Sequence, residues 1–208
     1  MLGLAIHTSS PELGLMLQSI DEATEPVKRH QVWELGREVS SHLHEKMIEF
    51  VAPHSWQDLG FIAVATGPGG FTGTRIGVVA ARTLAQQLDL PLFGVSSLAA
   101  IAHPHSHIGK DIAISMAAKR EAVFGAVYRP IEEDLSAVRF DEVMPVADWE
   151  KMLNQWEHPV TQVSIPARTG LGETVKGVMG IAIARYRKGD RPDWSTVMPF
   201  YGQHPVHR

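Results

Sequence analysis

A glycine-rich segment, TGPGGFTGTRIG, running from Thr66 to Gly77, is the part of the sequence whose residue types most suggest chemistry. It stands between an apolar run, FIAVA, and a helix-like run, VVAARTLAQQL. A strand, a glycine turn and a helix N-terminus present free backbone N–H groups and the positive end of a helix dipole, so an anion could bind there. On this interpretation Gly69, Gly70 and Thr72 would contact a nucleotide phosphate or another anion.

The two best-defined phosphate-binding patterns are both incomplete in this segment. The pattern G-x-x-x-x-G-K-[ST] is absent because no lysine follows the glycines, and G-x-G-x-x-G fails because Thr72 stands where the third glycine belongs. The alternative interpretation is a packing turn, in which glycines let two stretches of backbone come close. The spacing of the residues leaves both interpretations open.

A row of small residues follows the glycine segment. Gly73, Gly77, Ala81 and Ala85 recur every fourth residue and would form one line along a helix. A second line would form its core stripe, made of Ile76, Val79, Ala80, Thr83 and Leu84. The small-residue row would let another helix approach closely, either from a partner or from within its own domain. We expect a partner, so that Gly77→Leu should weaken association without destabilising the isolated chain.

Histidines elsewhere could in principle bind a metal ion. His103, His105 and His107 lie in a polar segment where imidazoles could converge, although solvated linker residues are the simpler interpretation. His44 begins a pattern like H-E-x-x-H, but Ile48 occupies the second histidine position, which excludes a zincin protease on this motif. We therefore expect no metal site.

Composition limits the classes of function. The 208 residues carry a formal net charge of -4, so there is no general basic field for unaided binding of nucleic acid. The sequence has no cysteine, which excludes disulfides, thiolate metal sites and a cysteine nucleophile. Neither a signal peptide nor a membrane-spanning run is recognisable, so we expect a cytoplasmic protein that does not associate with membranes.

The first half of the sequence predicts alternating strands and helices. LGLAI, ELGLMLQSI and VKRHQVWEL are typical of three consecutive strands, and the helical spacing from Glu34 to Val51 predicts a helix that Pro53 stops. FIAVA predicts a strand, 72–88 a helix, LFGVSS a strand and SLAAIAH a short helix. Three strands followed by alternating helices and strands indicate an α/β protein with a mixed sheet and flanking helices.

The polar segment HPHSHIGK, from His103 to Lys110, predicts a domain boundary near residue 105. Beyond it, DIAISMAA and AVFGAVY predict a hairpin, VADWEKMLNQW a short helix and VTQVSI a strand. A helix is expected from about Gly172 to Arg187. We therefore expect an N-terminal domain over 1–105, with the glycine segment, and a smaller C-terminal α/β domain over 106–208.

The glycine-rich segment and two further stretches resemble a known family. GPGGFTGTRIG, the GVSSL that follows about one helix later and a first strand ending in a T-S turn are similar to the TsaB family, also called YeaZ. That family acts in bacterial biosynthesis of tRNA threonylcarbamoyladenosine, the modified adenosine next to the anticodon. The resemblance covers roughly the first hundred residues well and the second half only loosely.

The resemblance implies an actin-like, ribonuclease H-like ATPase superfamily fold with two similar domains, the second of them reduced. It also implies a non-catalytic scaffold that supports threonylcarbamoyl transfer by its partner TsaD, with a TsaE-like protein as a third member. The chain alone would form a homodimer and would reach tRNA only through the complex. It would have no cofactor of its own, with ATP or magnesium bound only at the level of the complex.

The family resemblance further implies that the two N-terminal helices form the partner-facing surface. From the sequence we expect the following interface residues: Leu43, Met47, Gly73, Arg75, Gly77, Ala81 and Leu84.

The sequence departs from the family pattern at three positions. His7 stands where D-T-S would begin, Ala117 stands where the family has an aspartate, and Gly70 replaces a serine. An imidazole cannot supply the hard anionic oxygen that a nucleotide's metal ion needs. ATP hydrolysis by the chain alone is therefore not expected. The alternatives are a nucleotide-binding ATPase or phosphotransferase-like enzyme, a glycoprotease-type peptidase, and a structural relative that only homodimerises.

Overall fold

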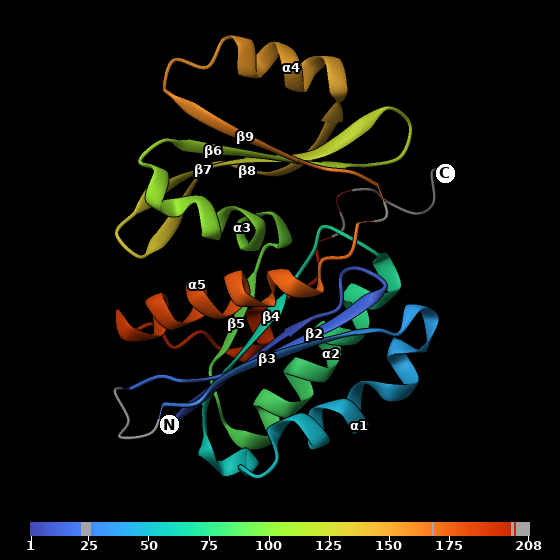
Figure 1. Ribbon diagram of the computed structural model, residues 1–208, viewed down its shortest axis with the longest axis vertical. Helices are drawn as coiled ribbons and strands as arrows, with labels where there is room; N and C mark the ends of the chain where they lie inside the picture. The colour runs from blue at the N-terminus through green and yellow to red at the C-terminus, as the bar shows by residue number, and fades with distance from the viewer. Residues whose placement is uncertain (22–25, 168, 201, 203–208) are drawn as a thin grey trace.

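The computed structural model describes residues 1–21, 26–167, 169–200 and 202. Two sheets are stacked with helices between them and on both outer faces (Figure 1). From bottom to top in Figure 1, the layers are α1 with α2, the first sheet, α5 with α3, the second sheet, and α4. The predicted α/β architecture with a mixed sheet and flanking helices is confirmed.

The first sheet has the strand order β3-β2-β1-β4-β5. Its strands are β1 (Leu2–His7), β2 (Glu12–Ser19), β3 (Lys28–Glu34), β4 (Leu59–Ala65) and β5 (Leu92–Val95). β1 pairs antiparallel with β2 and parallel with β4, as the predicted order of three strands and then αβ units requires. β1 and β4 are buried along their whole length because helices cover both faces, which explains their continuous apolar runs.

Two helices cover the outer face of the first sheet. They are α1 (Val39–Val51) and α2 (Phe71–Leu88), which lie side by side at the bottom of Figure 1. Leu43, Met47 and Phe50 of α1 point into the core under the sheet, which confirms the predicted periodicity of that helix. α2 ends at Asp89, whose left-handed backbone terminates the helix before Pro91.

The second sheet repeats the start of the first. Its order is β8-β7-β6-β9, formed by β6 (Asp111–Ala117), β7 (Ala122–Ile131), β8 (Asp134–Pro145) and β9 (Val160–Ile165). β6 pairs antiparallel with β7 and parallel with β9, as β1 does with β2 and β4. Among the described residues, one helix, α4 (Val146–Asn154), lies on the outer face.

The middle layer joins the two sheets. α3 (Ser97–Ala102) packs on β6 and β7 of the second sheet, and α5 (Val175–Arg187) packs on β1, β2, β4 and β5 of the first. Gly177 lies so close to the carbonyl of Ala100 that no side chain would fit between the two helices. One apolar cluster therefore contains residues from both halves of the chain.

The position of α5 differs from the expected division at residue 105. We expected 106–208 to form a separate smaller domain, whereas α5 covers the inner face of the first sheet and the segment around Pro192 runs along β5. A division of the chain at residue 105 therefore does not describe how its C-terminal part packs. In the described part of the chain, no helix combines the length and hydropathy that a membrane span needs.

Candidate functional site

The glycine segment packs against the turn that follows β1. A Cβ atom at Gly69 would overlap the carbonyl of Ser9, and one at Gly73 would overlap the carbonyl of Thr8. A Cβ atom at Gly77 would overlap the Thr8 hydroxyl. Only glycine leaves room for this approach, so the packing interpretation of the glycines holds within the chain itself.

Hydrogen bonds fix the glycine segment to this turn. The Thr8 hydroxyl donates to the carbonyl of Gly73 over 2.8 Å, and the backbone N–H of Gly70 donates to the carbonyl of Ser9 over 2.6 Å. One of the amides that an anion-binding loop would offer is therefore already bonded. Gly69, Gly70 and Thr72 remain exposed, and anion binding by them stays a prediction.

The buried face of α2 differs in part from the expected one: Ile76, Ala80 and Leu84 lie in or against the core as predicted, but the other two residues of the expected core stripe do not. Gly77, Ala81 and Ala85 are buried against the first sheet and the Thr8 turn, so the small-residue row faces its own domain. Val79 is 59% exposed and Thr83 is also exposed, although both were expected in the core stripe. The expectation that the small-residue row contacts a partner is wrong, because small side chains here let the helix pack tightly on its own sheet.

The predicted interface residues divide between core and surface. Leu43 and Met47 belong to the core cluster of the first half, and Leu84 packs against its edge. Arg75 is exposed and its guanidinium lies 5.4 Å from the centre of the Phe71 ring. Of the seven expected residues, Arg75 is therefore the one that is exposed, while Gly73 and Leu84 are half-buried and the other four are buried.

The exposed side of the two helices carries other apolar residues. Ile48 of α1 is 62% exposed, and Phe71 and Val79 of α2 are 43% and 59% exposed. We call Ile48, Phe71, Arg75 and Val79 the helix face. These apolar side chains lie on two helices that pack against each other, which makes the helix face a candidate surface for protein binding. The helical periodicity of the sequence assigned Val79 to the core stripe, so its exposure was not predicted.

The end of β1 holds a neutral buried imidazole. His7 is completely buried, and neither ring nitrogen has a hydrogen-bond partner among the described residues. Burial lowers the pKa of His7 to about 3, so the ring is neutral near pH 7. Ala117, at the end of the corresponding strand β6, is exposed and has no ionisable group. These two positions therefore supply neither a carboxylate nor a charge.

The histidine segment after α3 packs in part against α5. The ring of His103 lies against Gly180 of α5, and burial lowers its pKa. In the described part of the chain, no group of three or more histidine, aspartate or glutamate side chains is arranged to hold a metal ion.

Known proteins with similar sequences define the family. A family model described as TsaD, tRNA N6-adenosine threonylcarbamoyltransferase, matches residues 39–183, more than half of the chain. The tRNA threonylcarbamoyladenosine biosynthesis protein TsaB of Bacillus subtilis (strain 168) is 38% identical over 162 residues, which are 76% of this chain and 68% of that protein. TsaB of Escherichia coli (strain K12) is 39% identical over 74 residues, 36% of this chain and 31% of that protein. The chain belongs to the TsaB (YeaZ) family.

Solved structures agree on the fold of this TsaB-family chain. The structure described as YeaZ from Pseudomonas aeruginosa has a TM-score of 0.73 at 19% identity and covers 96% of this chain and 99% of its own. A second structure from that organism, described as similar to peptidase YEAZ, has a TM-score of 0.74 at 19% identity and covers 97% and 99%. The fold is the expected actin-like, ribonuclease H-like one.

One polar cluster in this TsaB-family chain was not predicted. The Asp141 carboxylate on β8 accepts hydrogen bonds from the Ser96 hydroxyl over 2.5 Å and from the Tyr128 hydroxyl over 2.6 Å. Ser96 also accepts from the backbone N–H groups of Leu98 and Ala99, so it caps α3. Burial raises the pKa values of Asp141 and Tyr128. The cluster connects the end of β5 to the second sheet. In the sequence, the Ser-Ser pair after a predicted strand was the only indication of this cluster.

Proposed function

We propose that the chain takes part in tRNA threonylcarbamoyladenosine biosynthesis as a non-catalytic subunit that supports a TsaD-like transferase. The observation that carries this proposal is the 38% identity to the Bacillus subtilis TsaB over 76% of the chain. The match of residues 39–183 to the TsaD family model adds to it, because a subunit that shares its partner's fold can pair with it through equivalent elements.

The residues at the strand ends support a role without catalysis. His7 is buried and neutral, and Ala117 has no ionisable group, so neither can hold a nucleotide's metal ion. The glycine segment already bonds to the turn at Ser9. The chain therefore needs no cofactor of its own, and ATP or magnesium enters with TsaD or a TsaE-like protein. The net charge of -4 favours tRNA binding through the complex and not by the chain alone. As a subunit that acts on tRNA, the chain would work in the cytoplasm.

The helix face is the proposed contact surface for the TsaD-like partner. Its members Ile48, Phe71 and Val79 expose apolar surface that association would bury, and Arg75 adds a charge beside it. In the absence of that partner, the same face would join two copies of the chain. The interface is thus made of the exposed sides of α1 and α2, and not of their buried small residues.

The experiment is reconstitution with TsaD and TsaE from the same organism, reading tRNA modification and complex formation separately. Val79→Lys should weaken binding to TsaD by at least tenfold and reduce modification, because it places a charge in an apolar contact. Val138→Lys is the matched control, since Val138 is 42% exposed on β8, outside the helix face, and should bind normally. Both variants should keep the unfolding temperature of the parent chain.

Two outcomes would contradict this proposal. Full modification activity in the complete absence of the chain would remove its role in the pathway. Magnesium-dependent ATP turnover or glycoprotein cleavage by the isolated chain would show that it is an enzyme in its own right. Equal loss of binding in Val79→Lys and Val138→Lys would leave the pathway assignment intact but move the interface away from the helix face.

A further inference from the structure

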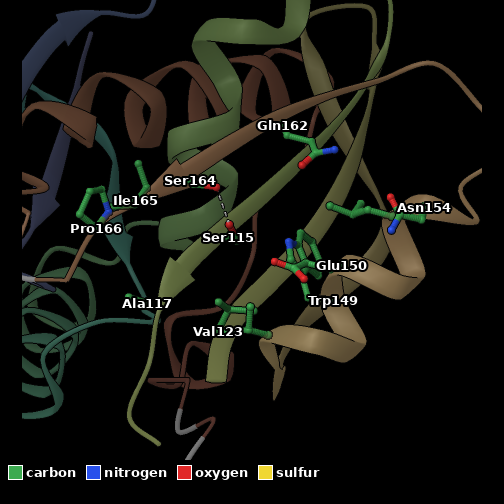
Figure 2. Close-up of a pocket in the computed structure, with 12 residues that line it drawn as sticks. Ser115, Ala117, Val123, Trp149, Glu150, Asn154, Gln162, Ser164, Ile165 and Pro166 are labelled. Carbon is green, nitrogen blue, oxygen red and sulfur yellow. Dashed lines mark hydrogen bonds between the residues drawn. The ribbon is translucent and has the colours of Figure 1, made fainter. Parts of the chain in front are cut away.

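A groove lies on the outer face of the second sheet, beside α4. Its volume is about 480 Å³, and Figure 2 shows that both polar and apolar side chains line it. Ser115 on β6 and Ser164 on β9 form the floor, with their hydroxyls 3.0 Å apart, and Gln162 extends the lining along β9. Glu150 and Asn154 of α4 form the opposite wall.

The groove exists because, in the described part of the chain, the second sheet has fewer strands, and fewer helices on its outer face, than the first. In the first sheet, α2 covers β1 and β4, and β5 pairs with the far edge of β4. β9 occupies the place of β4 in the second sheet, but α4 packs mainly over β7 and β8, with Val160 at the start of β9 joining its apolar cluster. Within the described residues, no strand pairs with the second edge of β9. Both a covering helix and a fifth strand are therefore missing at this position.

The other three sheet edges are protected in the ways that proteins ordinarily use. β3 carries Lys28, Arg29 and Glu34, and the backbone N–H of Leu92 on β5 donates to the carbonyl of Pro192. β8 shifts register twice along β7. By contrast, β9 reads VTQVSI, with no charged residue, no proline and a continuous register. An unprotected edge of this kind is a template for another strand.

The backbone of β9 is oriented for pairing on this edge. The N–H of Asp111 donates to the carbonyl of Pro159 over 3.0 Å, which directs alternate residues of β9 toward β6. The backbone groups of Val160, Gln162 and Ser164 consequently point toward the open edge. Gln162 and Ser164 also line the groove, so an added strand would lie along it.

The two faces of β9 define the chemistry of such a strand. On the inner face, Val163 and Ile165 are half-buried at the margin of the central core, so an added strand would extend an apolar surface there. On the outer face, the lining is mixed: Val123, Trp149 and Leu153 contribute apolar surface beside the polar side chains, and Glu150 is the one described lining residue with a formal charge. A long basic side chain on the outer face of the added strand would be complementary to Glu150.

We propose that β9 and the adjoining groove bind an extended segment of another protein by strand addition. The segment alternates apolar and polar side chains and carries a lysine or arginine on the polar face. Main-chain hydrogen bonds to Gln162 and Ser164 provide the pairing, and Glu150 provides selectivity. This surface lies on the second sheet, away from the helix face of α1 and α2.

The test is selection of random eight-residue peptides displayed on phage, with the whole chain as target and Gln162→Pro as counter-target. Proline removes an outward-facing N–H and is tolerated on an open strand edge. Enriched peptides should alternate apolar and polar residues and carry a basic residue at a polar position. Synthetic copies with a fluorescent label should bind at least tenfold more weakly to Gln162→Pro, whereas Gln162→Thr, which keeps the N–H and changes only the side chain in the groove, should cost much less. Glu150→Gln should weaken the binding of the peptides that carry a basic residue several-fold.

Several results would overturn the proposal. One is a selection that enriches no peptide on the parent chain over Gln162→Pro; another is equal binding of the synthetic peptides to both. A monomer–dimer equilibrium that Gln162→Pro abolishes, without peptide binding, would assign the edge to a second copy of the chain. If Gln162→Pro does not fold, the pair Gln162→Lys and Ser164→Lys replaces it, because lysines on an edge strand disfavour pairing. None of these measurements involves TsaD or tRNA, so they are independent of the proposed pathway.

Discussion

At the scale of single residues, His7 shows how one substitution changes the end of a strand. The ring is enclosed without a hydrogen-bond partner among the described residues, so protonating it in the folded chain would leave an uncompensated buried charge. The sequence identified His7 as a departure from the family pattern. It could not show the burial, because that depends on α5 and the second half of the chain covering the same side of the sheet.

His7 should make the folded chain sensitive to acid. Its pKa falls to about 3 on folding from the ordinary value of 6.5, so between these values the unfolded chain binds more protons. The stabilisation is fully present above about pH 6.5 and is lost as the pH falls toward 3, at about 1.4 kcal/mol per pH unit. In urea unfolding between pH 7.5 and 4.5, the free energy of unfolding should fall more steeply on acidification for the parent chain than for His7→Leu, which lacks the imidazole. Parallel curves would contradict this prediction.

Gly77 should be required for stability of the isolated chain. Alanine at this position adds a Cβ that overlaps the Thr8 hydroxyl, so we expect a loss of about 1–3 kcal/mol in spite of the better helix propensity of alanine. Thr83→Ala, on the exposed side of the same helix, should change stability by less than about 0.5 kcal/mol. In a double-mutant cycle with Thr8→Ala, the cost of Gly77→Ala should shrink. A cost that is unchanged would mean that Thr8 is not the obstacle.

At the scale of elements, hydrophobic periodicity predicted the order of strands and helices except for β8, which was missed, and it did not predict which face of α2 is buried. Both rows on α2 recur with helical spacing, and bulk alone favoured Val79 and Thr83 as core residues. The small-residue row is buried instead, because the Thr8 turn and the first sheet approach the helix closely. Pairings such as Ser96 with Asp141 join residues far apart in the sequence, and no local pattern encodes them.

Ser96 should anchor α3 to the second sheet. Ser96→Ala removes the helix cap and one of the two hydroxyl donors to the Asp141 carboxylate, so the free energy of unfolding should fall by about 2 kcal/mol. Ser97→Ala is the matched control, because the Ser97 hydroxyl is buried without a hydrogen-bond partner in the described part of the chain. Its removal should be neutral or stabilising. Chemical denaturation of both variants measures these changes. Equal losses in the free energy of unfolding would show that the Ser96 cluster has no special role in stability.

At the scale of the whole molecule, the two sheets share their helices. The inner face of the first sheet, including Met16, Phe61 and Phe93, packs in the same cluster as Val178 and Ile181 of α5. The Phe61 ring centre lies 5.3 Å from that of Phe93 and 5.2 Å from that of Tyr186. The polar segment after α3 suggested a boundary between autonomous domains, yet the chain crosses to the second sheet and then returns. A change in composition along the sequence cannot reveal that a later helix, α5, packs on the first sheet.

This sharing predicts that residues 1–105 alone do not form a stable domain. Without α5, the inner face of the first sheet would expose Met16, Phe61 and Phe93, and loss of that burial costs roughly 2 kcal/mol for each such side chain. The total is comparable to the whole stability of a domain of this size. The fragment should therefore bind a hydrophobic dye and lack dispersed amide resonances. Adding a synthetic peptide of residues 170–200 should restore dispersion, because it supplies α5 and the segment along β5. A cooperative unfolding transition of 1–105 without the peptide would contradict this prediction and support the boundary that the sequence suggested.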